Sequence, residues 1–135
     1  MFNSRHSKPQ NRIDSLVGAG TRIEGNVYFA GGLRVDGEIK GNVIADLSKP
    51  STLVLSEQAR VDGEIKATHL VVNGTVVGPV HAADYLELQS KAKVTGDVHY
   101  RTLEIQLGAI VEGRLIHLAE AADKVVAFKL GTAES

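Results

Sequence analysis

The 135-residue sequence has no cysteine, no tryptophan, three phenylalanines and three tyrosines. Without cysteine there is no disulfide framework, which favours a reducing, cytoplasmic setting. No apolar run approaches the roughly 20 residues that a membrane-spanning helix needs, and the N-terminus does not resemble a signal peptide. The scarcity of aromatic rings suits a narrow core filled by valine, isoleucine and leucine.

The sequence also lacks an excess of charge of either sign, since its formal net charge is -1. Basic residues are not interleaved with aromatic ones, so we expect no nucleic-acid binding. Gly18-Ala-Gly20 is rich in glycine but lacks the Lys-Ser/Thr ending of a phosphate-binding loop. We therefore expect neither a nucleotide nor another cofactor.

What the sequence does contain is one five-residue motif repeated six times: an apolar residue, any residue, glycine, any residue, an apolar residue. Its glycines are Gly25, Gly41, Gly63, Gly78, Gly96 and Gly113. They are 16, 22, 15, 18 and 17 residues apart by subtraction. A period of about seventeen is typical of a repeat architecture.

Aligning the copies produces four apolar columns. The first contains Ile23, Ile39, Val61, Val76, Val94 and Val111, and the second Val27, Val43, Ile65, Val80, Val98 and Leu115. The third contains Leu33, Leu53, Leu70, Leu86 and Leu103, with Leu118 as a candidate sixth member. The fourth contains Val35, Leu55, Val72, Leu88 and Ile105.

Apolar residues two apart have the period of a strand rather than a helix, and β-branched residues suit a pleated, half-buried surface. The pattern predicts an all-β fold, a parallel β-solenoid of about six rungs in which each coil contacts only its neighbours. Opposite charges at Glu24, Lys40 and Asp62 are expected to stack on its outside. The glycines are predicted at vertices, where an inward side chain would crowd the core or the chain needs a positive φ.

We expect three segments: an N-terminal tail (1–12), the solenoid (13–118) and a C-terminal tail (119–135), with both tails flexible. Ile13 and Leu16-Val17 are predicted to lay a partial strand across the first rung. Asp46–Thr52 is an insertion expected to bulge at a corner, and Pro79 should project outward or lie at a bend. Val125–Leu130 either caps the solenoid or frays.

The first residues have an apolar start followed by positive charge, with no acidic residue before Asp14. Composition alone is typical of a disordered tail. A second hypothesis is that the tail binds a membrane. Met1 and Phe2 would enter the membrane–water interface while Arg5 and Lys8 face anionic lipids. So short an anchor would need many copies side by side to hold.

Histidines are the main candidates for chemistry. His81 and His99 each follow the second apolar column, so they are predicted to stack on one outer face. A metal site would need a third convergent ligand, and neighbouring Lys66 and Ile116 provide none. His69 and His117 are expected near corners without partners. We predict neither a catalytic nor a metal site.

Two enzyme classes remain as alternatives. The first is a trimeric left-handed hexapeptide acyltransferase, but the steps of six residues are interrupted and no histidine can be assigned to a cleft. The second is a polysaccharide lyase on a right-handed β-helix, which would need a longer solenoid with a carboxylate-rich groove. Asp36, Asp62, Asp97 and Glu112 lie on different rungs and are interpreted as solvated turn residues.

The whole pattern from about Ile13 to Leu118 resembles the bactofilin domain, as shown by phrases such as Gly20-Thr-Arg-Ile-Glu-Gly25-Asn-Val and Val35-Asp-Gly-Glu-Ile-Lys-Gly-Asn-Val43. The Met1-Phe2 start is similar to the membrane-targeting tail of many bactofilins. The resemblance implies a right-handed β-helix that polymerises end to end without nucleotide into non-polar filaments. It also implies attachment to the inner face of the cytoplasmic membrane and a role as a scaffold for cell-wall enzymes. The insertion and the apolar Val125–Leu130 segment depart from the usual family pattern.

An open-ended solenoid is expected to associate through its ends unless they are capped. We predict subunit contacts at Ile13, Leu16 and Ile23 on one end and at Leu115, Ile116 and Leu118 on the other. A charge at Leu115 or Ile116 should shorten or abolish filaments without unfolding the chain. The remaining alternative is an adaptor that caps its own ends and does not polymerise.

Overall fold

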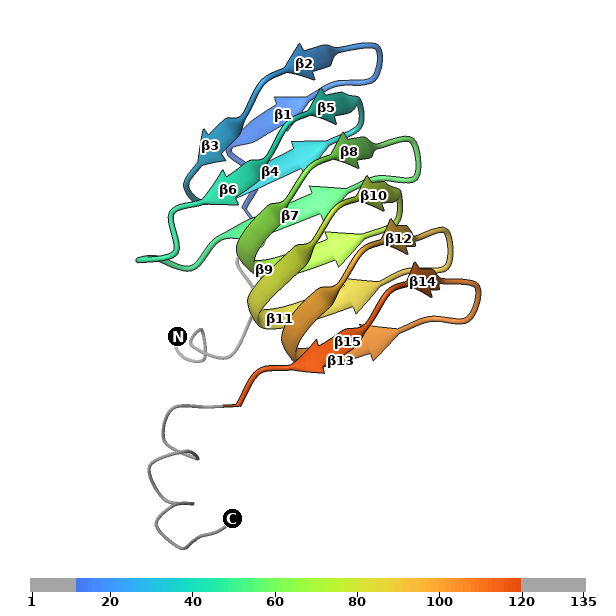
Figure 1. Ribbon diagram of the computed structural model, residues 1–135. Coiled ribbons are helices and arrows are strands. Elements are labelled where there is room, and N and C mark those ends of the chain that lie inside the picture. The colour runs from blue at the N-terminus through green and yellow to red at the C-terminus, as the bar shows by residue number, and fades with distance from the viewer. Residues whose placement is uncertain (1–11, 120–135) are drawn as a thin grey trace, which may run out of the picture.

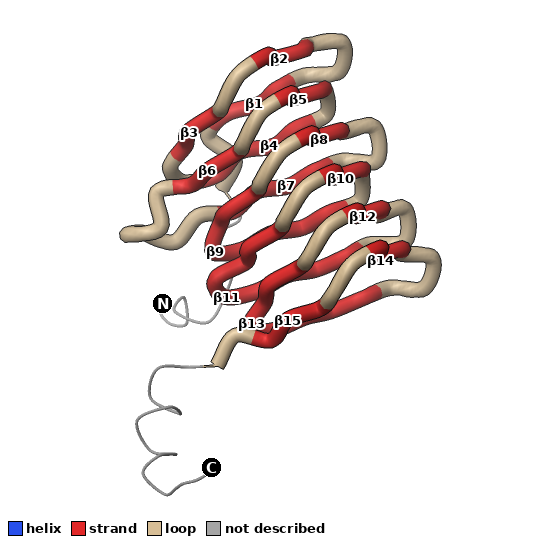
Figure 2. The backbone as a smooth tube through the Cα atoms, viewed as in Figure 1, coloured by secondary structure: helices blue, strands red, loops and turns tan. Residues whose placement is uncertain are grey.

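The computed structural model describes residues 12–119 and folds them into a parallel β-solenoid of about six coils, with no helix among these residues (Figures 1 and 2). The strands are β1 (Ser15–Val17), β2 (Arg22–Glu24), β3 (Val27–Phe29), β4 (Gly32–Val35), β5 (Glu38–Lys40), β6 (Val43–Ala45), β7 (Thr52–Leu55), β8 (Arg60–Asp62), β9 (Ile65–Val72), β10 (Thr75–Val77), β11 (Val80–Leu88), β12 (Lys93–Thr95), β13 (Val98–Ile105), β14 (Ile110–Glu112) and β15 (Leu115–His117).

Each coil crosses three faces in the same order. Face A consists of β1, β4, β7 and the C-terminal halves of β9, β11 and β13. Face B is the six-stranded sheet β2-β5-β8-β10-β12-β14. Face C consists of β3, β6, the N-terminal halves of β9, β11 and β13, and β15. From β9 onward one strand runs from face C into face A, with a register shift between Ala82 and Tyr85 marking the passage in β11.

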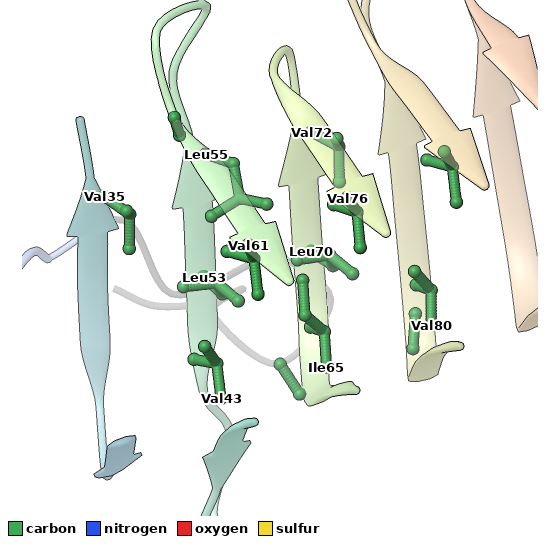
Figure 3. Packing of buried hydrophobic residues seen from close by; sticks show 14 of the residues in the cluster. Val35, Val43, Leu53, Leu55, Val61, Ile65, Leu70, Val72, Val76 and Val80 are labelled. Carbon is green, nitrogen blue, oxygen red and sulfur yellow. The ribbon is translucent and has the colours of Figure 1, made fainter. Parts of the chain in front are cut away.

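The predicted columns are confirmed by the pairing register. Ile23 pairs with Ile39 and Ile39 with Val61 on face B, while Val27 pairs with Val43 on face C. All four columns continue rung by rung and point inward, where their middle members are fully buried (Figure 3). The outer column also has the predicted register, with Lys40 between Glu24 and Asp62.

The sixth position of the third column was predicted wrongly. His117 pairs with Tyr100, and the next amide, that of Leu118, donates to the Tyr100 carbonyl at 2.7 Å. Leu118 therefore lies two residues short of the level of Leu103. The chain leaves the described region before it covers the last strand of face A.

The glycines lie at the vertex between faces B and C. Gly78 and Gly96 have φ angles of 147° and 144°, which an L side chain rarely adopts. A Cβ added to Gly96 would lie 2.5 Å from the Gly78 carbonyl oxygen one rung away. The tight contact is thus with the glycine of the neighbouring rung, stacked along the solenoid axis, rather than with the core.

Side chains following the glycines join successive rungs at this vertex. The Asn26 Oδ1 atom accepts the amide of Asn42, and the Asn42 Oδ1 atom accepts that of Glu64, each at 2.9 Å. On the last coil the Asp97 carboxylate accepts the Arg114 amide at 3.0 Å. Pro79 has no amide to offer and lies, as predicted, exposed at this bend. These bonds satisfy amides that would otherwise need water.

The insertion projects from the solenoid between β6 and β7, as predicted (Figure 1). Other predictions fall outside the described residues. They concern the membrane contacts Met1, Phe2, Arg5 and Lys8 and the Val125–Leu130 segment. Within residues 12–119 no helix is long and apolar enough to cross a membrane.

Candidate functional site: the open ends of the solenoid

The N-terminal end is formed by β1, β2 and β3, and no described strand pairs with their outer edges. Of the predicted contact residues, Ile23 belongs to the first core column and is only partly buried. Leu16 pairs with Arg34 in an outward column of face A and is 60% exposed. Ile13 precedes β1 and is also exposed. The three residues surround one edge of the first coil but do not all face the core.

The C-terminal end is formed by β14, β15 and the C-terminal half of β13. Leu115 ends the second core column and is 45% exposed, whereas Val98 on the rung before it is fully buried. Ile116 pairs with His99 in the outward column of face C, so its side chain faces sideways. Of the two β15 residues, Leu115 therefore belongs to the end surface.

Sequence reasoning missed three exposed apolar residues of the last coil. Leu107 is 96% exposed, and Ile105 and Ile110 are also exposed. A signal for two of them was present: Ile110 pairs with Lys93 on the previous rung, and Leu107 takes the place of Ser90, one repeat earlier. Where earlier coils have polar residues, the last coil has apolar ones.

Both ends therefore combine two features that favour association. Within residues 12–119, each presents backbone N–H and C=O groups of strand edges with no strand beyond them, and such groups can pair with another chain. Each also leaves core columns uncovered, at Ile23 and Val27 on one side and at Val111 and Leu115 on the other. Apolar area removed from water stabilises a contact by roughly 25 cal/mol per Å².

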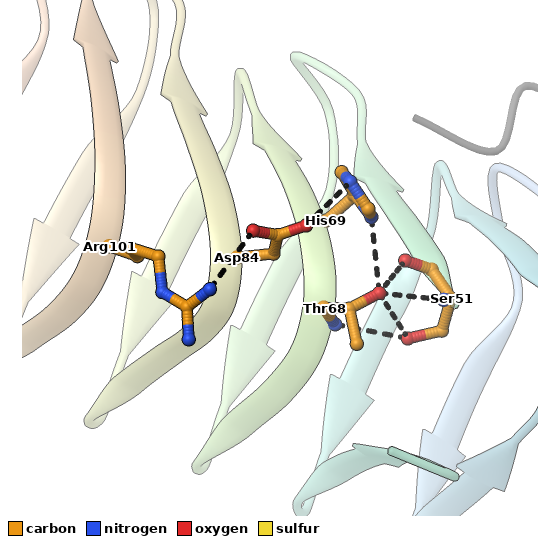
Figure 4. Close-up of polar contacts among 5 residues, drawn as sticks. All are labelled: Ser51, Thr68, His69, Asp84 and Arg101. Carbon is orange, nitrogen blue, oxygen red and sulfur yellow. Dashed lines mark hydrogen bonds and ion pairs between the residues drawn. The ribbon is translucent and has the colours of Figure 1, made fainter. Parts of the chain in front are cut away.

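A cluster of polar side chains from neighbouring rungs lies on the side of the solenoid (Figure 4). The His69 Nδ1 atom lies 3.1 Å from the Thr68 Oγ1 atom, and its Nε2 atom lies 3.4 Å from an Asp84 oxygen. Asp84 in turn faces Arg101 at 3.8 Å. The prediction that His69 has no partner is wrong, because residues of adjacent rungs meet here.

This cluster holds the insertion in place rather than activating a nucleophile. The Thr68 hydroxyl donates to the Ser51 carbonyl and accepts the Ser51 amide, each at 2.7 Å. The Thr68 amide donates to the buried Ser51 hydroxyl at 3.0 Å. Because the hydroxyl hydrogen of Thr68 is directed at a carbonyl, His69 is not placed to remove it.

The predicted histidine stack is present on face C. The His81 and His99 rings are 5.8 Å apart between centroids and 27° from parallel. His117 also has a ring neighbour, Tyr100 at 5.6 Å, so its predicted isolation is wrong. Among residues 12–119 no three histidine, aspartate or glutamate side chains gather closely enough to hold a metal ion.

Burial lowers the pKa of His81 below its usual value of 6.5, and the nearby charges of His99 and Lys66 lower it further. The folded state then binds this proton less readily than the unfolded state, so acidification favours unfolding. We expect the free energy of unfolding to fall as the pH decreases below about 6.5.

In H81Q this pH dependence should become shallower. Urea titrations between pH 8 and pH 5.5 would measure it, in a range where ordinary carboxylates stay ionised. H99Q removes one of the charges that lower the His81 pKa, so its pH dependence should also become shallower, but by less than in H81Q. An unchanged slope in H81Q would contradict the assignment.

The sequence of the chain matches the model of a known protein family. A family model named Bactofilin and described as polymer-forming cytoskeletal matches residues 15–116. These residues run from the start of β1 into β15, the last strand of the solenoid.

Two curated proteins of Myxococcus xanthus (strain DK1622) are similar to the chain. Bactofilin BacP is 27% identical over 109 residues, an alignment that covers 81% of this chain and 44% of BacP. Bactofilin BacO is 24% identical over 116 residues, covering 83% of this chain and 89% of BacO. The chain thus spans less than half the length of one relative and most of the other. No solved structure matches.

Proposed function

The chain belongs to the bactofilin family of polymer-forming cytoskeletal proteins, and we propose that it assembles end to end into nucleotide-independent, non-polar filaments. The observation that carries the proposal is that core columns end uncovered at both open ends. Leu115 is 45% exposed in a column whose middle members are fully buried. Contact with a second copy would bury these residues as an additional rung does.

This assembly needs no nucleotide as an energy source. Its driving force is apolar surface and unpaired strand edge that the folded chain already exposes. In a solenoid each added coil contributes an interface term similar to those inside the chain. A filament of such subunits would bury the same kinds of surface, apolar columns and strand edges, between molecules.

We further propose that the filament lies on the cytoplasmic face of the membrane and acts as a scaffold for cell-wall proteins. Support for the membrane contact comes from the sequence, where Met1-Phe2 precedes Arg5 and Lys8. One basic residue near anionic lipid contributes about 1 kcal/mol. A polymer that presents many such tails in a row would bind far more tightly than one chain.

Negative-stain electron microscopy of the purified chain without nucleotide tests the proposal, together with flotation of anionic vesicles on a density gradient, because filaments pellet without vesicles. We expect filaments in both the full chain and a variant lacking residues 1–8. Only the full chain should float with the vesicles, and replacement of Arg5 and Lys8 by glutamine should weaken this binding.

A discrete trimer that never elongates would contradict end-to-end assembly and would favour the hexapeptide-transferase alternative. Vesicle binding that survives removal of residues 1–8 would contradict the membrane contact but leave the filament proposal in place.

A further inference from the structure

The C-terminal half of β13 is the last strand of face A, and no described strand lies beyond it. Leu103 is only half-buried there and Ile105 is exposed, although both belong to core columns. Leu107, at the corner that follows, is almost fully exposed. Leu118 lies at the corner between faces C and A, where a further strand of face A would begin. The chain therefore leaves the described region beside an apolar edge that one more strand would cover.

The sequence after residue 119 repeats the pattern of this last strand and its corner. Residues 103–109 are Leu-Glu-Ile-Gln-Leu-Gly-Ala, and residues 126–132 are Val-Ala-Phe-Lys-Leu-Gly-Thr. Both segments have two apolar residues two apart, then a polar residue, and then Leu-Gly followed by a small residue. Apolar residues two apart point to the same side of a strand. In this alignment Val126 and Phe128 continue the third and fourth core columns, and Leu130 follows Leu107.

The glycine of the repeated pattern matches the turn that connects face A to face B. In the turns 18–21 and 106–109 the last amide donates to the first carbonyl, at 3.0 and 3.2 Å. Their third residues, Gly20 and Gly108, have φ angles of 87° and 102°. A turn with positive φ at its third residue favours glycine there. Residues 129–132 have glycine at the same third position.

The connection that this alignment requires already occurs once in the solenoid. Ala45 and His117 each lie two residues after a member of the second core column. The insertion places seven residues, by subtraction, between Ala45 and Leu53, the next member of the third column. Eight residues, by subtraction, lie between His117 and Val126. A detour of this length at the corner between faces C and A is therefore compatible with the fold.

From these observations we propose that residues 126–132 dock on the outer edge of β13 as a further parallel strand of face A and the corner after it. Val126 and Phe128 then cover the exposed ends of the third and fourth columns. The docked strand stands one strand spacing, about 4.8 Å, beyond β14 and β15. A second copy cannot contact Leu115 until this strand is displaced. The chain thus limits its own assembly at this end, an inference that rests on the proposed function.

Because the chain has no cysteine, an engineered disulfide can test the register of the docked strand. Thr102 is exposed and pairs with Tyr85 on the rung before it. The alignment places Val125 beside Thr102, with paired Cα atoms about 4.8 Å apart, a distance that a disulfide can bridge. We expect T102C/V125C, oxidised as dilute full-length chain, to lose both thiols at the mass of a monomer. T102C/V126C is the matched control and should keep its thiols, because Val126 points inward.

Free thiols in oxidised T102C/V125C would overturn the inference. A disulfide that joins two chains at the same dilution would also overturn it, because the docked strand would then come from a second copy.

Phe128→Ser is the second test, because it removes the larger of the two side chains that cover the core columns. A strand docked in about nine of ten chains leaves about a tenth of the ends open, so its release should lower the critical concentration for assembly about tenfold. Lys129→Ser is the matched control, since Lys129 points outward in the alignment, and it should assemble like the unmodified chain. Sedimentation over a series of protein concentrations measures the critical concentration. An unchanged or higher value in Phe128→Ser would overturn the inference.

Failure of this inference and failure of the proposed function give different results. Filaments that form while T102C/V125C keeps its thiols would overturn the docked strand and leave the proposed function intact. Absence of filaments from both the unmodified chain and Phe128→Ser would defeat the proposed function and the limit on assembly, while a T102C/V125C disulfide within one chain would still establish the docked strand.

Discussion

Gly96→Ala is expected to destabilise the solenoid more than any surface change. The added Cβ would lie 2.5 Å from the Gly78 carbonyl oxygen, a backbone atom that moves only if a whole rung moves. A residue with φ of 144° also carries strain of about 1–3 kcal/mol without glycine. Overpacking commonly adds another 1–3 kcal/mol. Denaturant unfolding followed by circular dichroism would measure the sum.

Gly25→Ala is the matched control. Its φ of 134° imposes a similar backbone strain, but a Cβ there meets nothing within 4 Å because no described rung precedes it. We expect Gly25→Ala to cost only the backbone term of about 1–3 kcal/mol. Equal losses in the two variants would show that rung stacking does not select glycine. Both should be measured at concentrations where the chain is dispersed.

Leu115→Glu is expected to abolish long filaments and leave the fold intact. Leu115 ends a core column and is 45% exposed, so a carboxylate there remains hydrated in the free subunit. At a subunit contact the same carboxylate would be buried without a partner, at a cost of several kcal/mol. Negative-stain microscopy and sedimentation would measure the loss, and circular dichroism the retained fold.

Val77→Glu provides a control for added charge. Val77 is 39% exposed and lies outward in the middle of face B, away from both ends. We expect its filaments to resemble those of the unmodified chain. Ile116, which faces sideways beside His99, should tolerate glutamate better than Leu115 does. Filaments that survive Leu115→Glu would argue against assembly through this end.

Which residues form the candidate site was only partly predictable. Leu115 and Ile23 follow from the columns, because the last member of any column has no rung beyond it. Leu107 and Ile110 on the side of the last coil were missed, although an apolar residue at a position that is polar on the previous rung is visible in the sequence. Leu16 was named for the end, yet it faces outward in the same column as Arg34. Apolar character alone did not distinguish an end surface from a side surface.

The sequence by itself determined the strands, the parallel register and the buried columns. Side-chain direction alternates with a local period of two, and a repeat of about seventeen residues brings equivalent positions together. Only the tertiary structure decided where Leu118 lies, which residues His69 contacts and what the glycines avoid. These depend on the path of the chain around its corners and on the axial distance between rungs, and neither is encoded in the alternation of apolar residues.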